Sequence, residues 1–178
     1  MIKRLLNILR RLLGRRRSAL SDNDFHSVFL LRKTDSPDMQ LTLHWIGRTP
    51  SDMEILRNIP NFTLVRIESA EGVEVGEDGS NAGASSGIIY IGGTAKDPMA
   101  RILKGASMEM PVIFGAEIAE SDEAYEILSI GGALTADNSA TLGRIADRLL
   151  HDPEEHRRRA AWIAEWLDYH NRQRVSNV

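Results

Sequence analysis

Short apolar segments recur along residues 25–135, and each is bounded by glycine, proline or polar residues. Their length and composition predict β-strands at 27–31, 41–46, 62–67, 88–91, 112–114 and 133–135. Apolar residues spaced three and four apart predict helices at 51–58, 97–107, 121–129, 139–150 and from Pro153 to about Arg172.

Strands that alternate with helices indicate an α/β fold, in which a parallel sheet carries helices on both faces. We therefore predict a single doubly wound, Rossmann-like domain over residues 25–175. Within this domain, residues 68–87 are rich in glycine, serine and acidic residues, which predicts a long mobile loop. A short polar linker, 18–24, precedes the domain.

The first 17 residues have the pattern of a basic amphipathic helix. Helical spacing places one apolar stripe on it, formed by Ile2, Leu5, Leu6, Leu9, Leu12 and Leu13. A helix of this kind fits the interface of an anionic membrane, where each basic residue adds about 1 kcal/mol. The membrane contact is predicted for Lys3, Arg4, Leu5, Leu9, Arg10, Arg11, Leu12, Leu13, Arg15, Arg16 and Arg17.

Two other interpretations of this segment stay open. A mitochondrial presequence is also rich in arginine, amphipathic and free of acidic residues. Alternatively, the leucines pack on the chain's own domain or on a partner protein.

Charge and composition narrow the range of partners and chemistries. After residue 17 the chain carries 15 basic and 25 acidic side chains, which argues against nucleic acid as a partner. The chain of 178 residues has no cysteine, so no disulfide or cysteine nucleophile is possible. No apolar run reaches the ~18 residues that a membrane span needs.

Candidate binding residues follow the predicted strands. The strand at 88–91 runs into Gly92 and Gly93, and a helix is predicted to begin near Asp97. Glycines admit a ligand close to the backbone, and a helix start with Lys96 beside it favours phosphate or carboxylate. A tight turn without a ligand explains the same pattern.

Two further glycine segments resemble the first. Gly115 follows the strand at 112–114 and leads to Glu117 and Glu120, which suit sugar or ribose hydroxyls. The carboxylates also suit the first turn of a helix without any ligand. The third segment, Gly131-Gly132, precedes the strand at 133–135. We expect all three at the ligand-binding edge of the sheet.

Several other patterns have weaker implications. Residues 83–87 fit GxSxG, but a nucleophile elbow needs a strand before the serine and a helix after it. His151 and His156 flank acidic residues without the spacing of a zinc helix, so we predict a helix–helix junction with solvated charges. Trp162, Trp166 and Tyr169 share one face of the last helix, which indicates core packing or a docking face.

From residue 88 onward, the chain resembles the carboxyl-terminal half of the 3-deoxy-D-manno-octulosonic acid (Kdo) transferases, GT-B glycosyltransferases of lipopolysaccharide assembly. The resemblance rests on the order and spacing of four segments along about eighty residues: Gly92-Gly93 followed by Asp97-Pro98, PVIFG at 111–115, GGA at 131–133 and LLHDPE at 149–154. The family's His-Asn pair is replaced by Thr94-Ala95-Lys96.

In this family the carboxyl-terminal half binds the nucleotide of the activated sugar. The resemblance implies that Asp97 holds ribose hydroxyls and that the glycines lie beside the nucleotide. The predicted nucleotide site therefore comprises Gly92, Gly93, Thr94, Lys96, Asp97, Gly115 and Glu117. No catalytic residue, metal ligand or cofactor is assigned.

The family's amino-terminal half, which carries the acceptor site and catalytic base, has no counterpart in these 178 residues. The resemblance thus implies a donor-binding subunit for a CMP- or UDP-linked sugar, with a partner chain that supplies the acceptor half. With the basic helix, it implies a peripheral protein on the cytoplasmic face of the inner membrane. The alternative is a non-catalytic relative that serves as a binding or assembly subunit at a membrane surface.

Overall fold

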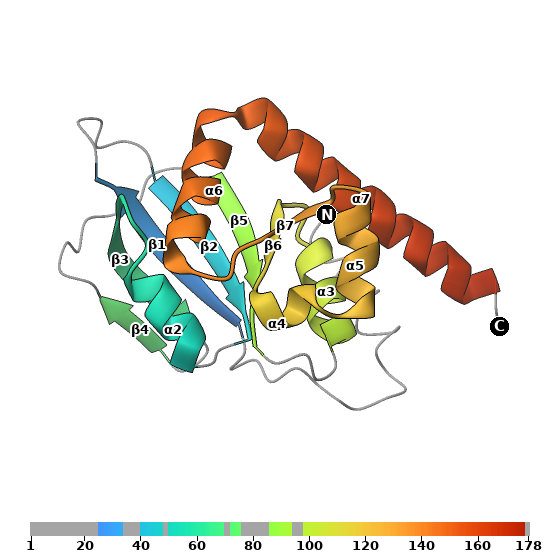
Figure 1. Ribbon diagram of the computed structural model, residues 1–178, viewed down its shortest axis with the longest axis horizontal. Helices are drawn as coiled ribbons and strands as arrows, with labels where there is room; N and C mark the ends of the chain where they lie inside the picture. The colour runs from blue at the N-terminus through green and yellow to red at the C-terminus, as the bar shows by residue number, and fades with distance from the viewer. Residues whose placement is uncertain are drawn as a thin grey trace.

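The computed structural model describes residues 25–33, 40–47, 50–69, 72–75, 86–93 and 98–176. These residues form an α/β domain around one seven-stranded mixed sheet, in the order β4-β3-β1-β2-β5-β6-β7 (Figure 1). The strands are β1 Phe25–Arg32, β2 Gln40–Ile46, β3 Phe62–Ser69, β4 Gly72–Val75, β5 Ser86–Ile91, β6 Val112–Phe114 and β7 Ala133–Thr135. The helices are α2 Pro50–Arg57, α3 Pro98–Ala106, α4 Ala116–Ala119, α5 Asp122–Ser129, α6 Ser139–His151 and α7 Pro153–Ser176.

All the strands and helices predicted from the hydrophobic pattern after residue 24 are present, with ends that differ by a few residues. The membrane helix predicted for residues 1–17 and the linker 18–24 lie outside the described residues. None of the described helices is both long and apolar enough to cross a membrane.

The prediction of a fully parallel sheet is wrong for one half of the sheet. β2, β5, β6 and β7 pair in parallel, whereas β1 is antiparallel to both of its neighbours and β4 is antiparallel to β3. Only residues 33–39 connect β1 to β2. A parallel crossover takes about a dozen residues or more, so this connection returns the chain antiparallel.

The prediction of a long loop at 68–87 is also wrong in part. β3 continues to Ser69, and β4 folds back on it so that Ser69 pairs with Gly72. The glycine and acidic residues that suggested a loop thus include a hairpin at the edge of the sheet. Edge strands are commonly short and charged, which hides them from a search for apolar runs.

Helices lie on both faces of the sheet and bury two apolar clusters. We call the face that carries α2 and α6 the front face, and the face that carries α3, α5 and α7 the back face (Figure 1). β5 shows why both faces are needed, since Ile88 and Tyr90 point to the front cluster while Ile89 and Ile91 point to the back cluster. Alternate residues of a strand face opposite sides, so a strand that is apolar at every position is buried on both.

The predicted helix–helix junction lies where α6 meets α7. Asp152 ends α6, and its Oδ1 accepts a hydrogen bond from the Glu155 backbone N–H at 2.8 Å, which caps α7. Glu155 itself is buried, in contrast to the solvated charges that were predicted. Its carboxylate pairs with Arg159 at 2.8 Å and with Arg148 at 3.2 Å, and Arg159 also donates to the Gly131 carbonyl.

His44 on β2 makes the stability of the domain sensitive to acid. Its ring stacks on Phe25 with centroids 5.8 Å apart, and its Nδ1 lies 3.2 Å from the Ser27 hydroxyl. Burial lowers the pKa of His44 from its usual value of 6.5. The unfolded chain then binds a proton more readily than the folded chain. The free energy of unfolding therefore falls as the pH drops from about 6.5 towards the depressed pKa of His44, whereas above about pH 6.5 His44 adds no pH dependence.

We therefore expect His44→Gln, which cannot be protonated, to flatten the dependence of the melting temperature on pH below about 6.5. The measurement is thermal unfolding of both proteins at pH 7.5, 6.5, 5.5 and 5.0. Parallel curves for the two proteins over this range would show that His44 does not contribute.

Candidate functional site

The structure places the first two predicted glycine segments at the same edge of the sheet. Gly92 and Gly93 follow the carboxyl end of β5, and Gly115 follows the carboxyl end of the neighbouring β6. Glu117, two residues after Gly115, is exposed on the short α4. The predicted contacts of Thr94, Lys96 and Asp97 lie outside the described residues.

The third glycine segment does not join them. Gly131 and Gly132 precede β7 and therefore lie at its amino end, on the opposite edge from Gly115. Gly131 has a φ of +73°, and a Cβ there would lie 3.3 Å from the Trp162 ring. Gly131 thus ends α5 in a left-handed conformation that glycine favours, which is a structural role.

The chain changes its winding direction between β2 and β5. These strands are adjacent and parallel. After β2 the chain passes through α2 on the front face to β3, whereas after β5 it passes through α3 on the back face to β6 (Figure 1). The two connections thus leave the sheet in opposite directions. In open α/β sheets, ligands bind outside the carboxyl ends of the strands at this kind of switch point.

At the switch point the backbones after β2 and β5 approach each other closely. Gly47 has a φ of +81°, and a Cβ on it would lie 2.6 Å from the Gly92 carbonyl oxygen. The Gly92 N–H donates to the Ile46 carbonyl at 2.9 Å. Gly47 was not recognised in the sequence, although a glycine directly after a strand is the same signal that identified Gly92.

Asp52 joins the two sides of the switch point. It comes from the first turn of α2, where its side chain is buried, and its Oδ2 accepts a hydrogen bond from the Gly93 N–H at 3.1 Å. A Cβ on Gly92 would lie 2.7 Å from Oδ1 of the same carboxylate. Gly92 therefore leaves room for Asp52 rather than for a ligand.

Tyr90 lies beneath this edge on the front face. Its ring packs against Trp45 with centroids 3.9 Å apart, and a Cβ on Gly115 would lie 2.6 Å from its hydroxyl oxygen. Within the described part of the chain, no side chain or backbone group forms a hydrogen bond with this hydroxyl. Burial, together with the negative charges of Asp52 and Asp137, raises the pKa of Tyr90, so the hydroxyl keeps its proton.

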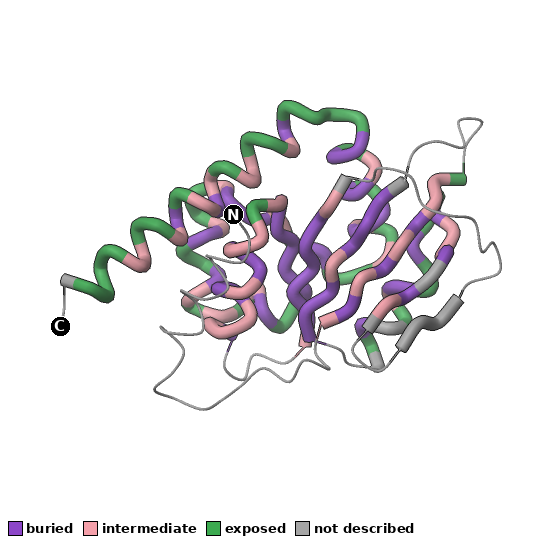
Figure 2. The backbone as a smooth tube through the Cα atoms, turned by 180° about the vertical axis from the view of Figure 1, so that it is seen from behind, coloured by how far each residue is buried: buried purple, intermediate pink, exposed green. Residues whose placement is uncertain are grey.

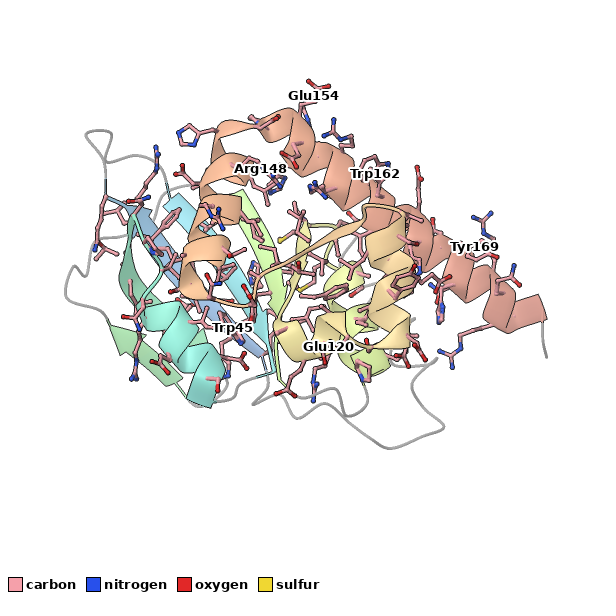
Figure 3. All side chains as sticks on the ribbon, viewed as in Figure 1. Trp45, Glu120, Arg148, Glu154, Trp162 and Tyr169 are labelled. Atoms are coloured by element: carbon pink, nitrogen blue, oxygen red, sulfur yellow. The ribbon has the colours of Figure 1, made fainter. Side chains whose placement is uncertain are left out.

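Arg101 of α3 brings a positive charge to the other side of the edge. A Cβ on Gly93 would lie 3.3 Å from an Arg101 guanidinium nitrogen. In Figure 3 the carboxyl ends of β2, β5 and β6 form the lower edge of the sheet, and Trp45 and Glu120 lie near it. Arg148 and Glu154 lie at the opposite edge, with the α6–α7 junction. Carboxylates, a protonated tyrosine and a guanidinium therefore gather at the carboxyl ends of β2, β5 and β6.

The sequence pattern indicated the glycines of this site but not the side chains around them. Asp52 was not singled out within the helix predicted at 51–58, nor Tyr90 within the strand predicted at 88–91. Asp52 and Gly93 are 41 positions apart in the chain, so their contact has no local signal. The glycines did give a local signal, because a glycine directly after a strand has no Cβ and often makes room for a close neighbour.

Comparison with family models, curated proteins and solved structures gave no match to this chain.

Proposed function

We propose that the chain is a donor-binding subunit that holds the sugar nucleotide of a glycosyltransferase reaction at the carboxyl ends of β2, β5 and β6. The observation that carries the proposal is the meeting of Asp52, Tyr90 and Arg101 at the switch point between β2 and β5.

The chemistry of these residues suits a ligand that carries both hydroxyls and phosphate. An ionised carboxylate accepts hydrogen bonds from ribose or sugar hydroxyls, and a tyrosine with a raised pKa donates one. A guanidinium suits phosphate oxygens. In this proposal Asp52 has a second task, because its bond to the Gly93 N–H fixes the turn between β5 and α3 against which the ligand lies.

The proposal includes a partner chain. Transfer in a GT-B enzyme takes place between two sheet domains, and the residues that the structure describes form one sheet. A second protein then supplies the acceptor site and the catalytic base. An acceptor linked to lipid fits a subunit whose first 17 residues are basic and amphipathic, at the cytoplasmic face of a membrane.

The test is calorimetric titration of CMP, UMP, UDP and their sugar conjugates into the full chain. We expect saturable binding of one class, weakened about 5- to 10-fold by Tyr90→Phe, because one hydrogen bond contributes about 1 kcal/mol. Tyr125→Phe is the matched control, since this tyrosine of α5 is 73% exposed and lies outside the site.

Unchanged affinity in Tyr90→Phe would remove its hydroxyl from the site. Absence of binding at millimolar ligand would instead favour a non-catalytic binding or assembly subunit. The second half of α7 gives that function some support, because Tyr169 and Val175 are 52% and 72% exposed there. Two large apolar side chains on one projecting helix suit contact with another protein.

A further inference from the structure

The connection from β7 to α6 crosses the front face of the sheet close to the candidate site. Residues 136–138 join the end of β7 to the start of α6. Leu142 and Ala146 of α6 then pack in the front cluster with β1 and β2. Since β6 and β5 lie between β7 and β2 in the sheet, the connection passes in front of these two strands (Figure 1).

Asp137 belongs to this connection and lies at the strand end that the Tyr90 hydroxyl reaches. The Ala136 N–H donates to the Phe114 carbonyl at 2.9 Å, which places the next residue, Asp137, beside the end of β6. A Cβ on Gly115, at the same strand end, would lie 2.6 Å from the Tyr90 hydroxyl oxygen. Burial is the main cause of the raised pKa of Tyr90, and the charge of Asp137 is among the groups that add to it.

Asn138 holds the Asp137 carboxylate in position. Its side-chain oxygen caps α6 by accepting a hydrogen bond from the Thr141 N–H at 2.8 Å, and its Nδ2 donates to Oδ1 of Asp137 at 2.7 Å. Within the described residues, Asp137 forms no other hydrogen bond or ion pair. Its second carboxylate oxygen can therefore accept a hydrogen bond from a ligand.

The Tyr90 hydroxyl shows that a ligand has a place here. Tyr90 is 1% exposed, and no described group forms a hydrogen bond with its hydroxyl. Buried polar groups nearly always have a hydrogen-bond partner, and one left without it costs stability. A ligand hydroxyl beside Tyr90 would supply the missing partner.

We propose that Asp137 is a specificity-determining residue of the donor site and that it favours an uncharged sugar over an acidic one. This inference rests on the proposed function. Asp52 and Asp137 bring two negative charges to the neighbourhood of Tyr90, whose hydroxyl keeps its proton. Sugar hydroxyls donate to carboxylates and accept from a tyrosine. An acidic sugar adds a like charge at the same place, which Coulomb repulsion opposes.

This selectivity differs from the one that the family resemblance implies. The sugar of the Kdo transferases, 3-deoxy-D-manno-octulosonic acid, carries a carboxylate. Beside Asp137 and Tyr90, that carboxylate would meet negative charge and a single donor. The charges around Tyr90 therefore favour a neutral sugar, such as a hexose linked to UDP, over a ulosonic acid linked to CMP.

Calorimetric titration of matched nucleotide sugars into the full chain tests the proposal. UDP-glucose and UDP-glucuronic acid differ only at C6 of the sugar, where the second carries a carboxylate. We expect the acid to bind about 10-fold more weakly than the neutral sugar. UDP-galactose and UDP-galacturonic acid form a second pair with the same expectation, and CMP-linked N-acetylneuraminic acid should bind no more tightly than CMP.

Asp137→Asn should reduce the ratio within each pair to about 3-fold, because the charge of Asp52 remains. The substitution keeps the side-chain shape and the oxygen that accepts from Asn138. Asp168→Asn is the matched control, since Asp168 is exposed on the second half of α7, which projects from the body of the domain (Figure 2). It removes the same charge away from the site, so its ratios should equal those of the wild type.

Three results would count against the proposal, and they are distinguishable. Equal or tighter binding of the acidic sugars to the wild-type chain would overturn the selectivity but leave the proposed function in place, because nucleotides would still bind. A ratio that Asp137→Asn leaves unchanged would remove Asp137 from the site. Absence of binding for every nucleotide tested would overturn the proposed function and the selectivity together.

Discussion

Replacement of Gly47 with alanine is expected to destabilise the domain by about 3 kcal/mol, because two costs add at one position. The first is conformational: Gly47 has a φ of +81°, and a left-handed backbone costs a residue with a side chain about 1–2 kcal/mol. The second is steric. The new Cβ would lie 2.6 Å from the Gly92 carbonyl oxygen, which belongs to the backbone and cannot rotate away.

Relief of that contact requires β2 and β5 to separate at their carboxyl ends, and overpacking of this kind costs about 1–3 kcal/mol. The separation would also strain the hydrogen bond from the Gly92 N–H to the Ile46 carbonyl. Because Asp52 and Gly93 lie at the same place, the sugar-nucleotide binding that we propose for the switch point should weaken together with stability.

Gly131→Ala is the matched control for the measurement by urea unfolding. Gly131 also has a positive φ, +73°, but the nearest atom to its new Cβ is a side-chain carbon of Trp162 at 3.3 Å. We expect a loss of about 1–2 kcal/mol there, from the conformational term alone. Equal losses for the two variants would mean that the backbones at the switch point are farther apart than the structure has them.

The second large effect is expected at Trp166, where substitution by alanine should cost about 3–5 kcal/mol. Trp166 is 4% exposed and belongs to the back cluster, and its ring stacks on His170 with centroids 5.1 Å apart. Together with Ile163, one turn earlier, it holds α7 against the domain. Removal of the indole leaves a cavity that α7 can close only by shifting along its whole length.

Tyr169→Ala separates this role from that of a docking face. Tyr169 lies one turn further on the same helix and is 52% exposed, so its removal should change the free energy of unfolding by less than about 0.5 kcal/mol. Urea unfolding of both variants is the measurement. A stable Trp166→Ala monomer would show that the ring is dispensable in the core and would return Trp166 to the docking face considered from the sequence.

The face formed by Trp162, Trp166 and Tyr169 therefore divides along its length. Trp166 is buried, Trp162 is partly buried beneath the Arg158 guanidinium at 5.5 Å, and Tyr169 extends past the body of the domain (Figure 3). Helical periodicity places the three residues on one face but does not tell where the sheet beneath them ends. That boundary depends on where β6 and β7 lie.

The sequence by itself determined the strands and helices of this protein, because each is specified by a local pattern of burial and by local stop signals. Residues 112–114 and 133–135 were predicted with the bounds that the structure has. Pro153 likewise indicated the start of the last helix, which begins at this residue in the structure. Such signals act over a few residues, so they need no knowledge of the fold.

Only the tertiary structure decided the direction of β1, the pairing of β4 and the make-up of the candidate site. Apolar alternation says that a strand is buried but not which strand lies beside it or in which direction, since both ladders satisfy the same hydrogen bonds. The carboxylate of Asp52 reaches Gly93 because β2 and β5 are neighbours, although a helix and two strands separate them in the chain. The glycines were visible in the sequence as bare backbone, but the side chains that fill the space beside them were determined by contacts between distant segments.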